Sequence, residues 1–509
     1  MAAVVTDQFR ILNASNFIDS VLDANNSYYV FLGLPNSSAV GFGRTSNWST
    51  ATSGPPSPTD NFEYLTHYRD TGIFGKRVTS TNIRRVIRKV QWTSNTAYDM
   101  YRHDYSSSNT TPNSGTSRLY DSNYYVINSD YRVYVCIDNG SSGTNLKGGR
   151  SKFEPTSTDL QPFSAGSDGY RWKYLFSISP SDIIKFDSTE YIVLPNDWAT
   201  SSDSQIQAVR EAGDSDVNNN QIKKVYIKNA GLGYTASTYD ILGDGTGGKV
   251  AITVDSNGAI TSTNVTTGGK GYTFGIVDLE RTGTISSAAN LIPIIPPSKG
   301  HGYDIYTELG ADRVLVYARF DDSTKDFPVD TKFSQVGIVK NPKEYSSGVT
   351  TFTGSNYSSL YALKLNSSYT GTPAVGERVT QEQSSTEIAK GWVASYDSDT
   401  KVLKYFRDRS LFLTNGINQE DRTTIGVDSK IVEFNNTTGI TFTSSSGTTV
   451  ASGFTGSSEN GINLGVNFTG GLANPEINKK TGDIIYIDNR PEVGRNLRQK
   501  EDVKIILEF

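Results

Sequence analysis

The stretch that decides the fold is Ser167-Asp168-Gly169-Tyr170-Arg171-Trp172-Lys173-Tyr174-Leu175-Phe176-Ser177-Ile178-Ser179-Pro180. It opens with a turn signal, Asp168-Gly169, and large apolar side chains then occupy every second position. This alternation predicts a β-strand over residues 170–178 with one apolar face, because successive side chains of a strand point to opposite faces of a sheet. That face is predicted to be core, and it carries, with Ile178, the side chains of Tyr170, Trp172, Tyr174 and Phe176.

The residues that follow predict a short helical turn and then a second strand. Ser179 is placed to be an N-cap, with Pro180 at the first helical position and Asp182 at the third. Residues 190–194 form a second apolar run that ends at a proline. The middle of the chain is therefore predicted to run strand, helical turn, strand.

The end of the chain shows the same alternation. Within residues 503–509, apolar side chains recur at every second position, and the predicted core includes Ile505, Leu507 and Phe509. A terminal strand this apolar must be paired in a sheet. We infer that it completes a β-sandwich begun by residues 170–178.

Composition excludes several classes of protein. The net charge of −5 and the absence of a long basic run argue against nucleic acid or an anionic membrane as a partner. No apolar run approaches the roughly 20 residues that a membrane-spanning helix needs, and the N-terminus lacks the pattern of a signal peptide. The single cysteine excludes an internal disulfide framework and favours synthesis in a reducing cytoplasm. The many Gly, Ser, Asn and Tyr residues favour short strands joined by turns.

Residues 82–92 show the one clear helical period in the first third of the chain. Apolar residues recur at positions 83, 86, 87 and 90, which predicts an amphipathic helix. Its other face would carry four cationic side chains, those of Arg84, Arg85, Arg88 and Lys89. Two interpretations stay open for this face: a solvated surface, or a candidate interface for an acidic partner.

Two segments differ in character from the rest and are predicted to be inserted domains. Within residues 205–289, the motif Asn229-Ala230-Gly231-Leu232-Gly233-Tyr234-Thr235 recurs as Thr267-Gly268-Gly269-Lys270-Gly271-Tyr272-Thr273, which indicates a duplicated β-domain. Residues 347–475 are predicted to form a small barrel-like β-domain with a β-arm. The predicted fold class is thus mainly β, a β-sandwich core with short helical excursions and two inserted all-β domains. The core is assigned to residues 1–204, 290–346 and 476–509.

No catalytic, cofactor or metal site is predicted. None of His67, His103 and His301 lies in a nucleophile or metal-ligand motif, and Cys136 lies in an apolar strand pattern typical of a buried thiol. The sequence 243–248 matches the glycine spacing of a dinucleotide site, but a strand rather than a helix is predicted to follow it. The acidic pairs Asp321-Asp322 and Glu420-Asp421 are interpreted as solvated charge.

Several segments, in order, resemble one family. The resemblance lies in residues 29–33, 86–92, 133–136 and 190–195, in Pro55-Pro56-Ser57-Pro58-Thr59-Asp60, in the aromatic strand at 166–176, in residues 482–487 with the turn Asp488-Asn489-Arg490-Pro491, and in 503–509. Together they resemble the baseplate wedge proteins of T-even-type contractile-tailed phages, the eighth-gene-product family. The resemblance covers roughly residues 1–204, 290–346 and 476–509, and leaves both inserts uncovered.

The resemblance implies a non-catalytic structural subunit of the virion tail, made in the host cytoplasm. It implies a homodimer placed beside the sixth, seventh and tenth gene products of the baseplate wedge, with a part in baseplate assembly, host attachment and sheath contraction. Two alternatives stay open. The 29 tyrosines and the glycine-rich inserts are compatible with a carbohydrate- or receptor-binding β-protein of the tail, and a tail-associated hydrolase is the third.

Overall fold

The computed structural model confirms the mainly β class, with many antiparallel sheets and few helices. Short, turn-punctuated runs of aromatic and β-branched residues favour this architecture, since such side chains pack well on a pleated surface. The structure describes residues 5–34, 65, 68–70, 72–214, 221–279, 285–321, 332–407, 430–494 and 499–509. Some residues named from the sequence lie outside this described part of the chain. They are residues 55–60, which carry part of the family resemblance, and His67, Asp322, Glu420 and Asp421.

The chain folds into two compact units. The first comprises Met1–Ile18, Arg84–Leu315 and Ile506–Phe509, and the second comprises Asp19–Ile83 and Val316–Ile505. The chain passes from one unit to the other within four elements: α1 (Asp7–Leu22), β3 (Ile83–Arg88), β14 (Arg313–Phe320) and β29 (Glu501–Glu508). The predicted insert 205–289 lies entirely in the first unit, and the predicted insert 347–475 lies entirely in the second.

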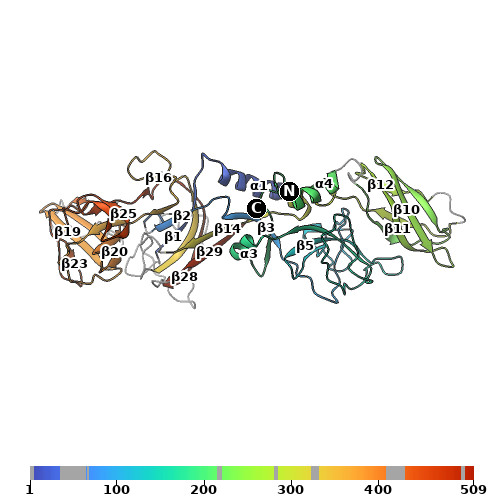
Figure 1. The fold of residues 1–509 in the computed structure, drawn as a ribbon, viewed down its shortest axis with the longest axis horizontal. Helices are drawn as coiled ribbons and strands as arrows, with labels where there is room; N and C mark the ends of the chain where they lie inside the picture. The colour runs from blue at the N-terminus through green and yellow to red at the C-terminus, as the bar shows by residue number, and fades with distance from the viewer. Residues whose placement is uncertain are drawn as a thin grey trace. The chain divides into compact units, whose positions relative to one another are not determined.

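The first unit also contains fourteen further described elements with these bounds: η2 (Leu119–Asp121), β4 (Tyr125–Ile127), β5 (Arg132–Asn139), β6 (Tyr170–Ser177), α3 (Pro180–Phe186), β7 (Tyr191–Val193), α4 (Ser204–Asp214), β8 (Val225–Asn229), β9 (Ser237–Gly243), β10 (Thr246–Val254), β11 (Ile260–Lys270), β12 (Gly275–Val277), β13 (Asn290–Pro293) and α5 (Ile305–Glu308). Their hydrogen-bonded sheets run β4-β5-β6, β11-β10-β9-β12 and β13-β8. Figure 1 labels β5, β10, β11 and β12 among these strands.

Strand β6 is the aromatic strand of the sequence, and it lies in the largest hydrophobic cluster of the first unit. Its four predicted core residues are all buried. The rings of Tyr170 and Trp172 stack with centroids 5.5 Å apart, and Tyr98 meets Trp172 edge-on at 5.8 Å. Lys173 and Leu175 are also buried, so the strand is covered on both faces rather than on the one face predicted.

The helical turn after β6 follows the sequence prediction. Ser179 is the N-cap of α3, and its hydroxyl accepts a hydrogen bond from the backbone N–H of Asp182 at 3.2 Å. Pro180 opens the helix, where its missing N–H costs nothing because that group would have no intrahelical acceptor. Strand β7 then pairs antiparallel with β3.

The duplicated motif builds a separate small core. Its strands β8 to β13 enclose a cluster that runs from Ile222 to Ile295 and includes the tyrosine of each copy, Tyr234 and Tyr272. The Tyr272 hydroxyl accepts from the N–H of Gly248 at 3.0 Å and donates to the carbonyl of Ile241 at 2.8 Å. The motif needs glycine because four of its positions have positive φ, namely Gly231, Gly233, Gly269 and Gly271.

The edges of this core differ slightly from the predicted segment 205–289. Helix α4 contributes Val209 to the cluster around β6, whereas β13 contributes Leu291 to the cluster of the duplicated motif. Strand β10 begins at Thr246, within the glycine-rich sequence at 243–248, so these glycines lead into a strand and not a helix, as predicted. The independent folding of this segment stays a prediction.

The second unit contains the remaining elements: β1 (Tyr28–Gly33), β2 (Gly72–Arg77), β15 (Lys332–Lys340), β16 (Lys343–Glu344), β17 (Asn356–Ser358), β18 (Tyr361–Lys364), β19 (Arg378–Ser384), β20 (Glu387–Asp397), β21 (Val402–Phe406), β22 (Lys430–Val432), β23 (Thr441–Phe442), β24 (Gly456–Glu459), β25 (Ile462–Phe468), β26 (Leu472–Ala473), β27 (Ile477–Asn478) and β28 (Asp483–Gly494). One sheet has the order β17-β2-β1-β15-β28, and its strand β1 is buried at all six positions.

The second predicted insert has its own sheet and its own core. The sheet runs β23-β19-β20-β21-β18-β26, with β22 paired to β20. Its strands β19, β20 and β23 are labelled in Figure 1. A hydrophobic cluster extends from Leu363 to Val450 along these strands. Strand β17 lies within the predicted segment 347–475 but pairs with β2 in the other sheet of this unit, so the separate sheet begins after it.

The C-terminal residues form strand β29, which is paired in the sheet β29-β14-β3-β7, so the prediction of a paired terminal strand is confirmed. This sheet is not the one that contains β6. Ile505 is buried, but Leu507 and Phe509 of the edge strand β29 are only half-buried. The ring of Phe509 packs against that of Phe17 on α1, with centroids 5.6 Å apart.

Candidate functional site

The helix predicted for residues 82–92 is wrong, because β3 (Ile83–Arg88) is an extended strand. Two of its cationic side chains have partners inside the first unit. Arg84 forms an ion pair with Asp182 of α3 at 2.9 Å. Arg85 is buried, and its guanidinium lies 4.1 Å from the centre of the Tyr306 ring, a cation–π contact that compensates part of its desolvation.

The other two cationic side chains bind loops. Arg88 donates to the Asn123 side chain and to the Ser122 carbonyl, both at 2.9 Å. Lys89 donates to the Ser188 carbonyl at 2.9 Å and lies 3.3 Å from the Asp187 carboxylate. A strand sends neighbouring side chains to opposite faces, so the four cations do not share the one surface that a helix would have given them. The helical surface on which an interface for an acidic partner was predicted is therefore absent among these described residues. The interface itself stays a prediction.

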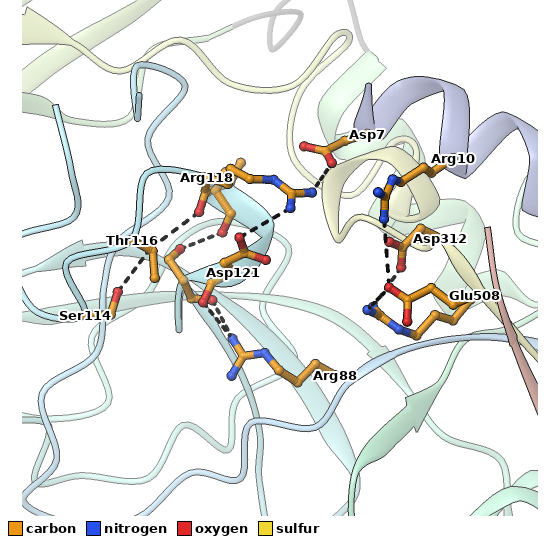
Figure 2. A network of polar contacts seen from close by, with 12 residues as sticks. Asp7, Arg10, Arg88, Ser114, Thr116, Arg118, Asp121, Asp312 and Glu508 are labelled. Carbon is orange, nitrogen blue, oxygen red and sulfur yellow. Dashed lines mark hydrogen bonds and ion pairs between the residues drawn. The ribbon is translucent and has the colours of Figure 1, made fainter. Parts of the chain in front are cut away.

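A network of polar contacts joins the N-terminal helix to the loop before β4. Figure 2 shows Arg118 between Asp7 of α1 and Asp121 of η2. The Arg118–Asp121 ion pair measures 3.5 Å, and the hydrogen bond to Asp7 raises the pKa of Arg118 above its ordinary value. Arg88 donates to the carbonyl of Asp121, which connects β3 to the same loop.

The same figure shows a second group of charges around the end of β29. Glu508 accepts from Arg313 of β14 at 2.8 Å and lies 3.9 Å from Arg10 of α1. Asp312 pairs with Arg313 at 2.8 Å. The pKa of the Asp312 carboxyl is raised above its ordinary value, because the effect of burial exceeds the opposing effect of Arg313. These contacts attach both ends of the described chain to the first unit. Most of these side chains are partly exposed, so each ion pair contributes little stability by itself, about 0–1 kcal/mol.

The groups considered for catalysis have structural partners. His301 Nδ1 lies 2.6 Å from the Glu308 carboxylate, which also accepts from the N–H of Gly302, and both side chains of the pair are buried. His103 Nδ1 accepts from the backbone N–H of Ile295 at 3.2 Å, and burial lowers the pKa of this imidazole. The imidazole ring of His301 is thus held by a carboxylate, and that of His103 by a backbone N–H.

The one cysteine does not have the environment of a nucleophile. Cys136 is fully buried in β5, and burial raises the pKa of its thiol well above the ordinary value. A reactive cysteine needs the opposite shift, since the thiolate is the nucleophile. Within the residues that the structure describes, no cluster of three or more His, Cys, Asp and Glu side chains could hold a metal ion. No helix of that part of the chain is both long and apolar enough to cross a membrane.

Comparison with known proteins gives one relevant similarity. Over 220 residues the chain is 26% identical to the baseplate wedge protein gp8 of Enterobacteria phage T4. The chain is similar to a phage baseplate protein. The match covers 38% of this chain and 60% of the T4 protein. No protein-family model matches the chain.

The network of Figure 2 was not predicted from the sequence. Its members are far apart along the chain: Asp7 and Arg118 are separated by 111 positions, and Arg313 and Glu508 by 195. The only sequence signal was the apolar character of the last residues, which required a paired strand but did not specify its charged neighbours.

Proposed function

We propose that this protein is a structural subunit of a phage tail baseplate wedge and acts through protein–protein interfaces rather than catalysis. The observation that carries the proposal is the 26% identity over 220 residues to the T4 baseplate wedge protein. The mainly β architecture with separate cores for two additional segments supports it, since such a chain offers several rigid surfaces. The buried thiol and the bound imidazoles of His103 and His301 offer no support for an enzyme.

The proposal includes a location and partners. The protein would be made in the host cytoplasm and would reside in the virion, in the tail baseplate. It would form a homodimer and contact the counterparts of the sixth, seventh and tenth gene products of T-even phages. Permanent contacts of this kind commonly bury well over 1,000 Å² in total. In this role the subunit would contribute to baseplate assembly, host attachment and sheath contraction.

A carbohydrate- or receptor-binding role is the weaker alternative. The basis for this role is the number of tyrosines, because exposed aromatic rings can stack on sugars. Many of those rings are instead inside the fold. Eight are among the largest fully buried side chains: Tyr29, Tyr68, Tyr98, Tyr124, Tyr125, Tyr134, Tyr170 and Tyr272. The tyrosine content therefore reflects core packing as much as any surface.

Co-expression tests the structural role. The full chain is produced together with the tail proteins encoded by neighbouring genes of its own genome, and complexes are separated by size with light-scattering detection. We expect the chain alone to elute as a dimer and the mixture to yield a larger complex that contains it. A monomer that joins none of these proteins would contradict the proposal, and turnover of peptidoglycan by the purified chain would favour an enzyme.

A further inference from the structure

The second unit contains a cleft of about 450 Å³. Its walls come from the end of β2, the residues just before β3, the last part of β14 and the loop before β17. Sites that hold a ligand commonly enclose roughly 300–1,000 Å³, so the cleft is large enough for one. Thr353 and Arg319 on its walls are exposed, so solvent reaches it.

The cleft is locally basic in a chain whose net charge is −5. Three cations line it, Lys76 and Arg77 of β2 and Arg319 of β14, together with the carboxylate of Asp321. Arg319 is also ion-paired with Asp502, so the positive charge without a described carboxylate partner is that of Lys76 and Arg77. A concentration of positive charge in a concave site raises the local potential and attracts anions. Charge complementarity therefore indicates an acidic ligand.

Two of these cations are held in place by their own contacts. Arg319 donates through Nε and Nη2 to the Asp502 carboxylate at 2.7 and 2.9 Å, and Tyr317 donates to the same carboxylate at 2.8 Å. Arg77 donates from Nη1 to the Thr353 carbonyl at 2.6 Å. Each guanidinium has five N–H groups, so both keep donors beyond these bonds.

Lys76 differs from the two arginines. Among the described residues its ammonium group has no hydrogen-bond or ion-pair partner, although the side chain is only partly exposed. The amide N–H₂ of Asn82, another lining residue, also has no acceptor among them, because this side chain uses only its oxygen, to accept from Thr79 and Thr81. Within the described part of the chain, the cleft thus has two donor groups without an acceptor beside two guanidinium groups held by hydrogen bonds.

We propose that this cleft binds an acidic, extended peptide segment of another protein. The cations are carried by two separate strands, and the cleft is larger than a single inorganic anion requires, so carboxylates spaced along a segment fit it better than one phosphate. The proposal goes beyond the baseplate role and does not depend on it, because it needs only this unit and a peptide of the stated charge.

Binding of a fluorescein-labelled hexaglutamate peptide to the full chain, followed by fluorescence anisotropy, tests the proposal. We expect saturable binding that weakens as salt increases, since exposed charges are screened. Lys76→Glu should weaken binding at least tenfold, and the neutral variant Lys76→Gln about threefold. Lys480→Glu is the matched control, because Lys480 is an exposed lysine of the same unit outside the cleft and the change in net charge is identical. It should change the affinity less than twofold.

Three results would overturn the proposal. The first is no binding of hexaglutamate by the unmodified chain at low salt. The second is an equal loss of affinity in Lys76→Glu and Lys480→Glu, which would mean that net charge rather than the cleft is responsible. The third is displacement of the peptide by an equal concentration of inorganic phosphate, which would assign the cleft to small anions. Lys76→Gln keeps the test valid if Lys76→Glu does not fold.

Discussion

Strands β6 and β29 have the same length and the same kind of place in a sheet, but they are stabilised differently. Each has eight residues and stands at the end of its sheet. Six residues of β6 are buried, against two of β29. Phe163 forms a backbone bridge to Trp172 on the outer edge of β6, and Leu160, Phe163 and Ala165 pack against the cluster that contains this strand. Burial of an edge strand therefore depends on what packs over it, not on its position alone.

The charged residues of the two strands follow the same contrast. Lys173 of β6 is buried, and its ammonium group donates to the Leu160 carbonyl at 2.6 Å. Asp502 of β29 is exposed and forms a two-point ion pair with Arg319. An apolar core thus stabilises β6, whereas partly exposed polar contacts supplement a thin core around β29. Four predictions test this contrast.

The largest effect is expected for Trp172→Ala. The side chain is fully buried in the aromatic cluster, so its removal should lower the free energy of unfolding by about 3–5 kcal/mol. Urea denaturation followed by far-UV circular dichroism measures the change. A loss below about 1 kcal/mol would mean that β6 is not the core strand described here.

A smaller effect is expected at the C-terminal strand. Ile505→Ala removes a buried side chain and should cost roughly 2–4 kcal/mol in the same measurement. Leu507→Ala provides the matched control, because Leu507 is half-buried on the same strand, and it should cost less than half as much. Equal losses of unfolding free energy in the two variants would contradict the conclusion that Ile505 is buried and Leu507 only half-buried.

The buried ammonium of Lys173 should make stability depend on pH. Burial lowers the pKa of Lys173 from 10.5 to about 8. Between these values the unfolded chain retains the proton that the folded chain has lost, so the unfolded state binds more protons and stability rises with pH. The unmodified chain should gain about 2–3 kcal/mol over Lys173→Met between pH 8 and pH 10.5. Denaturation curves of both proteins across this range measure the difference, and parallel pH profiles would contradict it.

The smallest effect is expected for Asp502→Asn. The ion pair with Arg319 is exposed, so its loss should cost about 0–1 kcal/mol at neutral pH. The hydrogen bond from Arg319 lowers the pKa of Asp502, and its contribution is therefore present above the unfolded value near 4 and disappears as the pH falls through the lower folded value. The variant and the unmodified chain should converge in acid. A cost above 2 kcal/mol at neutral pH would show that β29 depends on this pair.

Sequence patterns predicted the two strands but not how each is packed. Alternation identified both, since a period of two is a local property of the chain. The burial of Lys173 on the second face of β6 depends on segments distant in sequence, such as the loop that supplies the Leu160 carbonyl. Local patterns cannot indicate such cover, and this is why one apolar face was predicted where two are buried.

The error at β3 has a different cause. The apolar residues at 83, 86, 87 and 90 fit a helical period, but all four are Ile or Val. Such β-branched side chains lose rotamer freedom in a helix and favour a sheet. Pairing with β7 and β14 then determines the strand. The cations of β3 consequently have partners on separate elements, which a helical projection could not show.

The central claim, that this chain is a structural subunit of a baseplate wedge, is tested most directly by cryo-electron microscopy of the phage tail that its genome encodes. We expect density for the sheets of both units at a repeated position in the baseplate, in contact with neighbouring wedge proteins. A complete baseplate map in which this chain occupies no density, from particles that infect normally, would contradict the claim.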